Sequence, residues 1–76
     1  MGTMRILDPT GDTAIEWKVD DPASVAEADA LFARLTAERK LAFARAAGAP
    51  AAEAELIRRF DPTAEEIVWV RPVAGG

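Results

Sequence analysis

Large apolar side chains are scarce in this chain, and that shortage limits the folds it can adopt. Half of the 76 residues are apolar, but 17 of them are alanine and only 21 are Ile, Leu, Val, Phe, Trp or Met. Ordering each residue costs about 1.5 kcal/mol, so the few large side chains must be buried efficiently. We therefore expect one small domain without a deep substrate cavity, which argues against an enzyme.

Two residue types that commonly perform catalysis or bind metals are absent. The sequence contains neither cysteine nor histidine, which excludes thiolate nucleophiles, disulfides, the usual zinc sites and the ordinary histidine base. A cysteine-free small domain fits a reducing cytoplasm, and no apolar run approaches the ~20 residues of a membrane span. We predict a cytoplasmic protein that requires no metal and no cofactor.

The charge balance is acidic. Thirteen acidic and nine basic residues give a net charge of -4, and the arginines are scattered apart from the pair Arg58-Arg59. This balance disfavours nucleic acids and anionic membranes as partners. The acidic pairs Asp20-Asp21 and Glu65-Glu66 have no histidine and no third clustered ligand nearby, so they are poor candidates for acid–base catalysis or metal binding.

The first 19 residues predict a hairpin. Met4–Leu7 reads as a short strand, and the segment Asp8–Asp12 has the proline and glycine of a turn. Residues 13–19 then alternate between apolar and polar positions, which is the period of a half-buried strand. One face of this second strand carries Ile15, Trp17 and Val19. Residues 1–3 look like a cloning remnant ahead of a natural start at Met4.

One helix is predicted to follow the hairpin. Asp21 suits the N-cap position and Pro22 the first helical position, while Ser24 and Glu27 have the spacing of a second possible cap. An apolar stripe along the segment indicates the side that packs on the core. The stripe consists of Val25, Ala28, Leu31, Phe32 and Leu35. We expect the helix to end near Lys40.

The next segments are less uniform. Residues 41–45 suggest a third strand, in which Leu41 and Phe43 alternate with small or charged neighbours. Gly48-Ala49-Pro50 breaks the chain. Residues 51–60 fit a helix by their alanine and glutamate content, but the end of this segment fits a strand equally well.

A cap-like pair precedes the last strand. Asp61-Pro62 has the same pattern as Asp21-Pro22, an aspartate that can cap a helix followed by a proline suited to the first helical position. We therefore expect a single helical turn over Thr63–Glu66. Ile67–Val70 is apolar at every position, as expected for a strand that is covered on both faces or lies centrally in a sheet.

The last six residues, Arg71-Pro72-Val73-Ala74-Gly75-Gly76, suit a carboxyl terminus that is itself the reactive group. Glycine has no side chain, so Gly75 and Gly76 can pass through a narrow channel and present a bare carboxylate to an enzyme. Pro72 would stiffen the exit of the tail from the sheet through its fixed φ. A tag or linker can also end in Gly-Gly, and a proline can simply terminate a strand.

The predicted order of elements is similar to that of the ubiquitin-like β-grasp fold. That fold is α+β, with one helix packed across a mixed sheet of four to five strands, and its first and last strands pair in parallel. Residues 65–76 also resemble the endings of small sulfur carriers, such as the small subunit of molybdopterin synthase and the thiamine sulfur carrier, and of prokaryotic ubiquitin-like modifiers. Arg71 departs from the molybdopterin subunit, in which a second proline is common. The amino-terminal half carries no sulfur-carrier motif.

The resemblance implies a single domain over residues 4–71 with a flexible tail over residues 72–76. It also implies a protein carrier or modifier, not an enzyme. An adenylating enzyme would convert the Gly76 carboxylate into an acyl-adenylate, and a thiol or sulfur donor would then displace AMP to give a thioester or thiocarboxylate. Gly75 would provide clearance. A sulfur donor, a sulfur acceptor enzyme or a deconjugating metalloprotease are further expected partners.

Four residues near the tail are candidates for binding the partner: Trp69, Arg71, Pro72 and Val73. Tryptophan is enriched in interface hot spots, and an exposed arginine can guide the tail into an acidic groove, although Arg71 can equally be a solvated side chain. Trp17 is expected in the core.

Two alternatives stay open: a non-covalent interaction module of the same fold, and a helical miniprotein if residues 51–60 are helical and the strand predictions are wrong.

Overall fold

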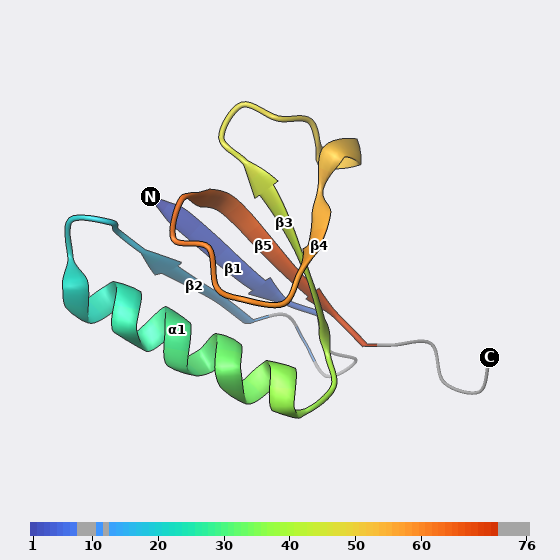
Figure 1. The fold of residues 1–76 in the computed structure, drawn as a ribbon, viewed down its shortest axis with the longest axis horizontal. Coiled ribbons are helices and arrows are strands. Elements are labelled where there is room, and N and C mark those ends of the chain that lie inside the picture. The colour runs from blue at the N-terminus through green and yellow to red at the C-terminus, as the bar shows by residue number, and fades with distance from the viewer. Residues whose placement is uncertain (8–10, 12, 72–76) are drawn as a thin grey trace.

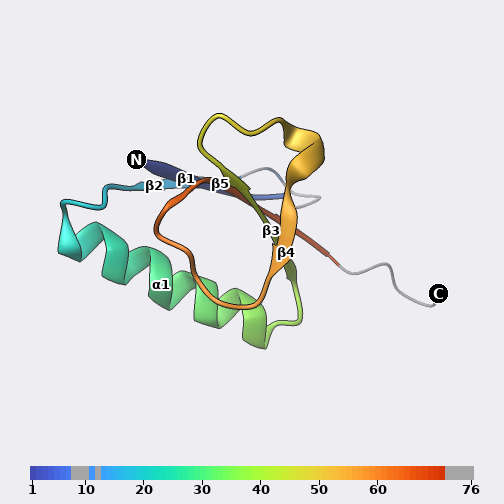
Figure 2. The ribbon, with the colours of Figure 1, turned by 45° about the horizontal axis from the view of Figure 1, so that its top comes forward.

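A computed structural model describes residues 1–7, 11 and 13–71 of the chain. Within these residues, one α-helix packs against one side of a mixed five-stranded sheet (Figures 1 and 2). This arrangement confirms the α+β class and excludes the helical miniprotein. The elements are β1 (Gly2–Ile6), β2 (Thr13–Trp17), α1 (Pro22–Ala37), β3 (Leu41–Ala46), the 3-10 helix η1 (Ala51–Glu53), β4 (Glu55–Ile57) and β5 (Ala64–Val70).

The strands are ordered β2-β1-β5-β3-β4, so β5 lies at the centre of the sheet. β1 pairs with β5 in parallel, with Met4 opposite Ile67 and Ile6 opposite Trp69. The other three pairings are antiparallel. The predicted parallel pairing of the first and last strands is therefore confirmed, and so is the central position of Ile67–Val70.

The folded sheet begins at Gly2, so the predicted domain start at Met4 is wrong. Gly2 pairs with Trp17 across β1 and β2, and a Cβ atom added to Gly2 would overlap Cζ2 of Trp17. The indole ring therefore lies directly against the glycine backbone. Gly2 and Thr3 belong to the strand that supports the core.

The loop between β2 and α1 explains two differences from the predicted pattern. Asp21 is the N-cap as predicted, because its Oδ1 accepts hydrogen bonds from the backbone N–H groups of Ala23 and Ser24. Ser24 is not a second cap: its hydroxyl donates to the carbonyls of Lys18 and Asp21 and accepts from the Lys18 N–H. These bonds turn the chain after Trp17, which leaves Val19 60% exposed instead of facing the core.

The helix ends at Ala37, earlier than the predicted end near Lys40. Arg39 adopts a left-handed backbone conformation, with φ of 65°, and this conformation stops a helix and reverses the chain. The N–H of Lys40 then donates to the carbonyl of Leu35. The reversal brings Leu41 directly into β3.

Residues 51–60 are neither one helix nor one long strand, because η1 is followed by the three-residue strand β4. The predicted helical turn over Thr63–Glu66 is wrong. Asp61 Oδ1 instead accepts hydrogen bonds from both the N–H and the hydroxyl of Thr63, and the Ala64 N–H donates to the Asp61 carbonyl. This tight turn starts β5 at Ala64.

Aromatic side chains join the helix to the sheet. Phe32 packs edge-on against Trp69, with ring centroids 4.7 Å apart, and Phe60 packs edge-on against Trp17 at 5.0 Å. Trp17 Nε1 donates a hydrogen bond to the Pro62 carbonyl. The Trp17 side chain is fully buried, which confirms its expected core position. The buried core residues are Met4, Ile6, Trp17, Ala28, Phe32, Leu35, Ala42, Ala64, Ile67 and Trp69.

We predict that Phe32→Ala and Leu35→Ala each lower the free energy of unfolding by about 2–5 kcal/mol, because each leaves a cavity beneath α1. Both side chains are at most 3% exposed. Urea unfolding followed by circular dichroism measures the change. Glu27→Ala, on the exposed side of the same helix, is the matched control and should stay within about 0.5 kcal/mol; equal losses in all three variants would contradict this packing.

We also predict that Gly2→Ala lowers the free energy of unfolding by about 1–3 kcal/mol, because the added methyl group overlaps the Trp17 ring. Thr3→Ala is the control, since Thr3 faces the other side of the same strand and its truncation creates no overlap. Thermal unfolding of the two variants provides the comparison. A Gly2→Ala protein as stable as the parent would show that β1 is not held against Trp17.

Candidate functional site

The predicted partner-binding residues lie in different environments in the structure. Trp69 is 1% exposed and packs on Phe32, so it is a core residue and its prediction as an interface residue is wrong. The cause is strand alternation, which places Trp69 on the same face as the buried Ile67. Arg71 follows β5 directly and is exposed. Pro72, Val73, Gly75 and Gly76 lie outside the described residues.

A different set of apolar residues faces away from α1. Alternate residues of a strand point to opposite faces of the sheet. The residues next to the core residues along β3, β4 and β5 therefore form a second apolar surface, on the side of the sheet away from α1. Phe43 of β3 lies opposite both Leu56 and Val68, and Leu41 lies opposite Val70. We call this surface the open-face cluster: Leu41, Phe43, Leu56, Val68 and Val70, together with Leu7, which follows the core residue Ile6 and whose N–H donates to the Trp69 carbonyl.

The open-face cluster is incompletely covered. Leu7 is 42%, Leu41 37% and Leu56 46% exposed, while the remaining members are half-buried. Small soluble proteins rarely expose contiguous large apolar side chains without a partner. The cluster also includes Val70, the last residue of β5, so a protein bound to it would lie beside the start of the tail. This surface is the best candidate for a partner-binding site.

Sequence reasoning missed the open-face cluster because it did not assign faces to β3. The signal was present: Leu41 and Phe43 alternate with Ala42 and Ala44. The alanines lie on the helix side of the sheet, where Ala42 is 2% exposed and the rings of Phe32 and Trp69 already fill the space. The larger residues of this strand are consequently left on the opposite face.

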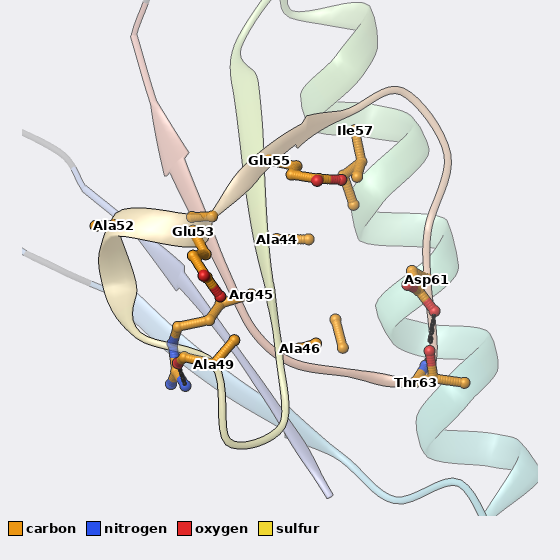
Figure 3. A pocket seen from close by; sticks show the side chains of 12 residues that line it. Ala44, Arg45, Ala46, Ala49, Ala52, Glu53, Glu55, Ile57, Asp61 and Thr63 are labelled. Atoms are coloured by element: carbon orange, nitrogen blue, oxygen red, sulfur yellow. Dashed lines mark hydrogen bonds between the residues drawn. The ribbon is translucent and has the colours of Figure 1, made fainter.

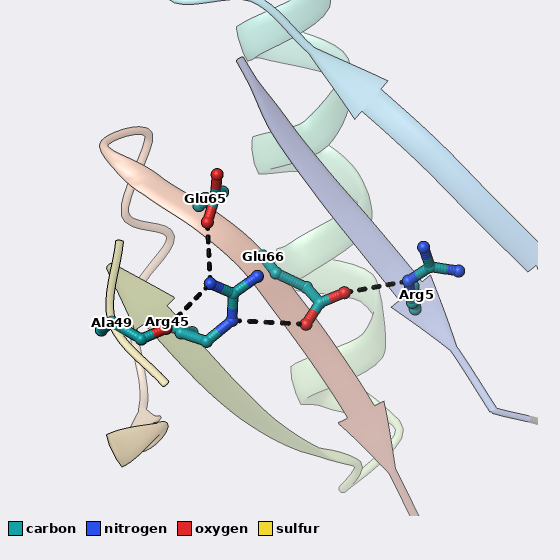
Figure 4. Close-up of polar contacts among 5 residues, drawn as sticks. All are labelled: Arg5, Arg45, Ala49, Glu65 and Glu66. Atoms are coloured by element: carbon teal, nitrogen blue, oxygen red, sulfur yellow. Dashed lines mark hydrogen bonds and ion pairs between the residues drawn. The ribbon is translucent and has the colours of Figure 1, made fainter. Parts of the chain in front are cut away.

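Charged residues on the same face form a connected network at its other end (Figure 4). Glu66 bridges two arginines, with Oε2 2.9 Å from Arg5 Nε and Oε1 3.7 Å from Arg45 Nε. Arg45 also contacts Glu65 at 2.7 Å and donates to the Ala49 carbonyl at 3.0 Å. The acidic pair Glu65-Glu66 is thus engaged by arginines, an arrangement that suits alignment of β1, β5 and β3 better than proton transfer.

A shallow hollow of about 600 Å³ lies between β3, η1 and the turn before β5 (Figure 3). Half of the residues that line it are alanines, and its polar groups come from Arg45, Glu53, Glu55, Asp61 and Thr63. Asp61 already accepts two hydrogen bonds from Thr63. Within the described part of the chain, no group of three or more acidic residues is arranged to hold a metal ion. Arg45 is likewise engaged by Glu65 and by the Ala49 carbonyl, so two of the polar groups of the hollow already have partners within the chain.

Comparisons with known proteins do not add a family to this description: no family model, no curated protein and no solved structure matches the chain. Among the residues that the structure describes, no helix is both long and apolar enough to cross a membrane. The candidate site is therefore argued from the geometry of this structure alone.

We predict that Leu56→Ala and Ile57→Ala have unequal effects on stability although the residues are neighbours in β4. Ile57 lies on the helix side and packs against the core, so its truncation should cost about 1–3 kcal/mol, whereas Leu56 is 46% exposed and should cost under about 1 kcal/mol. Urea unfolding midpoints measure both changes. A larger loss at Leu56 would mean that the open-face cluster is an internal core.

Proposed function

We propose that this protein is a ubiquitin-like β-grasp carrier or modifier whose Gly76 carboxylate is activated by an adenylating enzyme. The single observation that carries the proposal is the position of β5. This strand is central in the sheet and parallel to β1, and it ends at Val70 beside the open-face cluster. The Gly-Gly ending begins only five residues later.

The fold supports this proposal through its order of elements. A hairpin, one helix, further strands and a last strand parallel to the first are the features expected of a β-grasp domain, and all of them are present. The position of Arg71 is also compatible with it, because an exposed cation at the end of β5 is available to an acidic groove. Sulfur carriage is favoured over conjugation by the proline-containing tail.

The chemistry requires only a carboxylate from this chain. A Gly76 carboxylate oxygen attacks the α-phosphorus of ATP, pyrophosphate leaves, and an acyl-adenylate results. A sulfur nucleophile then attacks the carbonyl carbon and expels AMP, which leaves a thioester or a thiocarboxylate. The partner enzymes supply ATP binding and the nucleophile. The proposal applies to a chain with Gly76 as its last residue, as translated or after processing.

A non-covalent interaction module is the second candidate. The open-face cluster favours it, because an exposed apolar surface is sufficient to bind a partner without any reaction at the terminus. Under this alternative, residues 75–76 are dispensable and the exposed leucines are not. The two candidates therefore predict different effects for the same truncation.

We predict that the chain gains AMP at Gly76 when it is incubated with ATP and its cognate adenylating enzyme, and later exchanges AMP for sulfur. Intact-protein mass spectrometry detects both products. A carboxyl-terminal amide is the control, because it removes the attacking oxyanion and leaves the rest of the chain unchanged. An amidated protein that is adenylated as well as the parent would locate the reaction elsewhere.

We further predict that deletion of Gly75-Gly76 changes the free energy of unfolding by less than about 0.5 kcal/mol but abolishes function in a cell-based assay. The reason is that these residues follow the sheet and the proposal gives them a chemical role only. Thermal unfolding and complementation are measured on the same variant. Full activity of the truncated chain would exclude terminal activation and leave the interaction module.

A further inference from the structure

Basic residues gather where the end of α1 meets the end of β4. Arg39 and Lys40 follow the helix, and Arg58 and Arg59 follow β4. Lys40 contacts Glu38 at 3.3 Å, but no ion pair within the described residues involves Arg39, Arg58 or Arg59. By contrast, the arginines near the other end of the sheet, Arg5 and Arg45, are both paired with glutamates.

A hollow of about 230 Å³ lies within this basic region. Its apolar wall includes Leu41, Leu56 and Ile57, and its charged rim includes Arg39, Lys40 and Arg58. Leu41 and Leu56 are the exposed corner of the open-face cluster. The hollow is therefore continuous with that cluster and surrounds an apolar floor with cations.

A second hollow of about 480 Å³ extends this surface along α1. It shares Thr36 and Arg58 with the first. It is lined further by Phe32, Phe60 and Arg59, and by one carboxylate, Asp29, on the helix. The two hollows together form an elongated groove beside β4, which is an edge strand of the sheet. No backbone hydrogen bond of the described chain joins β4 to an element other than β3.

We propose that this groove binds an extended acidic segment of a partner protein. An apolar side chain of the segment occupies the hollow over Leu41 and Leu56, and flanking carboxylates pair with Arg39, Arg58 and Arg59. The elongated shape and the edge strand favour an extended peptide, because such a peptide can add its backbone to a sheet edge. The apolar floor favours a peptide over a simple anion, since an anion gains nothing from leucine side chains.

The overall charge of the chain also favours a peptide over a nucleic acid. A net charge of -4 repels a long polyanion, whereas a short acidic segment contacts only the basic groove. The proposal concerns recognition alone and does not depend on activation of Gly76. Its failure would leave the adenylation experiment unaffected, and the reverse also holds.

The test uses the full chain labelled with ¹⁵N and three synthetic peptides as probes. The first is acetyl-Asp-Glu-Asp-Leu-Phe-Asp-Glu-Asp-amide, the second replaces its Leu-Phe by Ala-Ala, and the third replaces its acidic residues by lysine. We expect the first peptide to shift the amide signals of Thr36, Leu41, Leu56 and Arg58, and to bind more weakly as salt increases. The two control peptides should bind at least about 10-fold more weakly.

Charge reversal locates the contact on the protein. The double variant Arg39→Glu, Arg58→Glu should weaken binding of the first peptide about 10-fold or more, and Arg39→Gln, Arg58→Gln should show a smaller loss in the same direction. Lys18→Glu, between β2 and α1, is the matched control and should bind as the parent does. Thermal unfolding of each variant verifies that it is folded.

Three outcomes would overturn the proposal. The first is an equal response to the acidic and lysine peptides, which would remove the charge argument. The second is an equal response to the Leu-Phe and Ala-Ala peptides, or to inorganic pyrophosphate at matched charge, which would reduce the groove to an anion site. The third is a set of shifts located away from α1 and β4, or no shift at all.

Discussion

The rest of the structure depends on the parallel pairing of β1 with β5. This pairing joins segments that are about sixty residues apart, as the Arg5–Glu66 ion pair across it shows, with a sequence separation of 61. Closing so long a loop costs chain entropy, and the residues brought together offset that cost by burial. Met4, Ile6, Ile67 and Trp69 form the middle of the core and are at most 9% exposed.

The shortage of large side chains shapes both faces of the sheet. The helix side of the sheet receives Trp17 and Trp69 together with small residues such as Ala42 and Ala64, because the two tryptophans and Phe32 leave little room beneath α1. The opposite face carries Leu41, Phe43, Leu56, Val68 and Val70 of β3, β4 and β5. A thin core on one side and an exposed apolar cluster on the other are two consequences of the same composition.

This partition places the open-face cluster next to the strand that leads to the proposed reactive terminus. The open-face cluster reaches Val70, and the proposed reactive terminus lies a few residues beyond it. A partner bound to the cluster would therefore lie close to the end of β5, from which the tail continues. The basic groove beside β4 adds charge selectivity at the corner of the same surface, while the paired arginines Arg5 and Arg45 neutralise the far end.

Local chemistry determined the elements that the sequence alone predicts. Asp21 and Pro22 start the helix, the apolar stripe around Phe32 selects its buried side, and an all-apolar run marks the central strand. These features act within a few residues, so they are readable along the chain. Tertiary structure decided the rest: Trp69 is buried and Leu56 exposed because the helix covers only one face. The contact of Gly2 with Trp17 and the turn at Asp61 likewise depend on neighbours that only the folded sheet brings together.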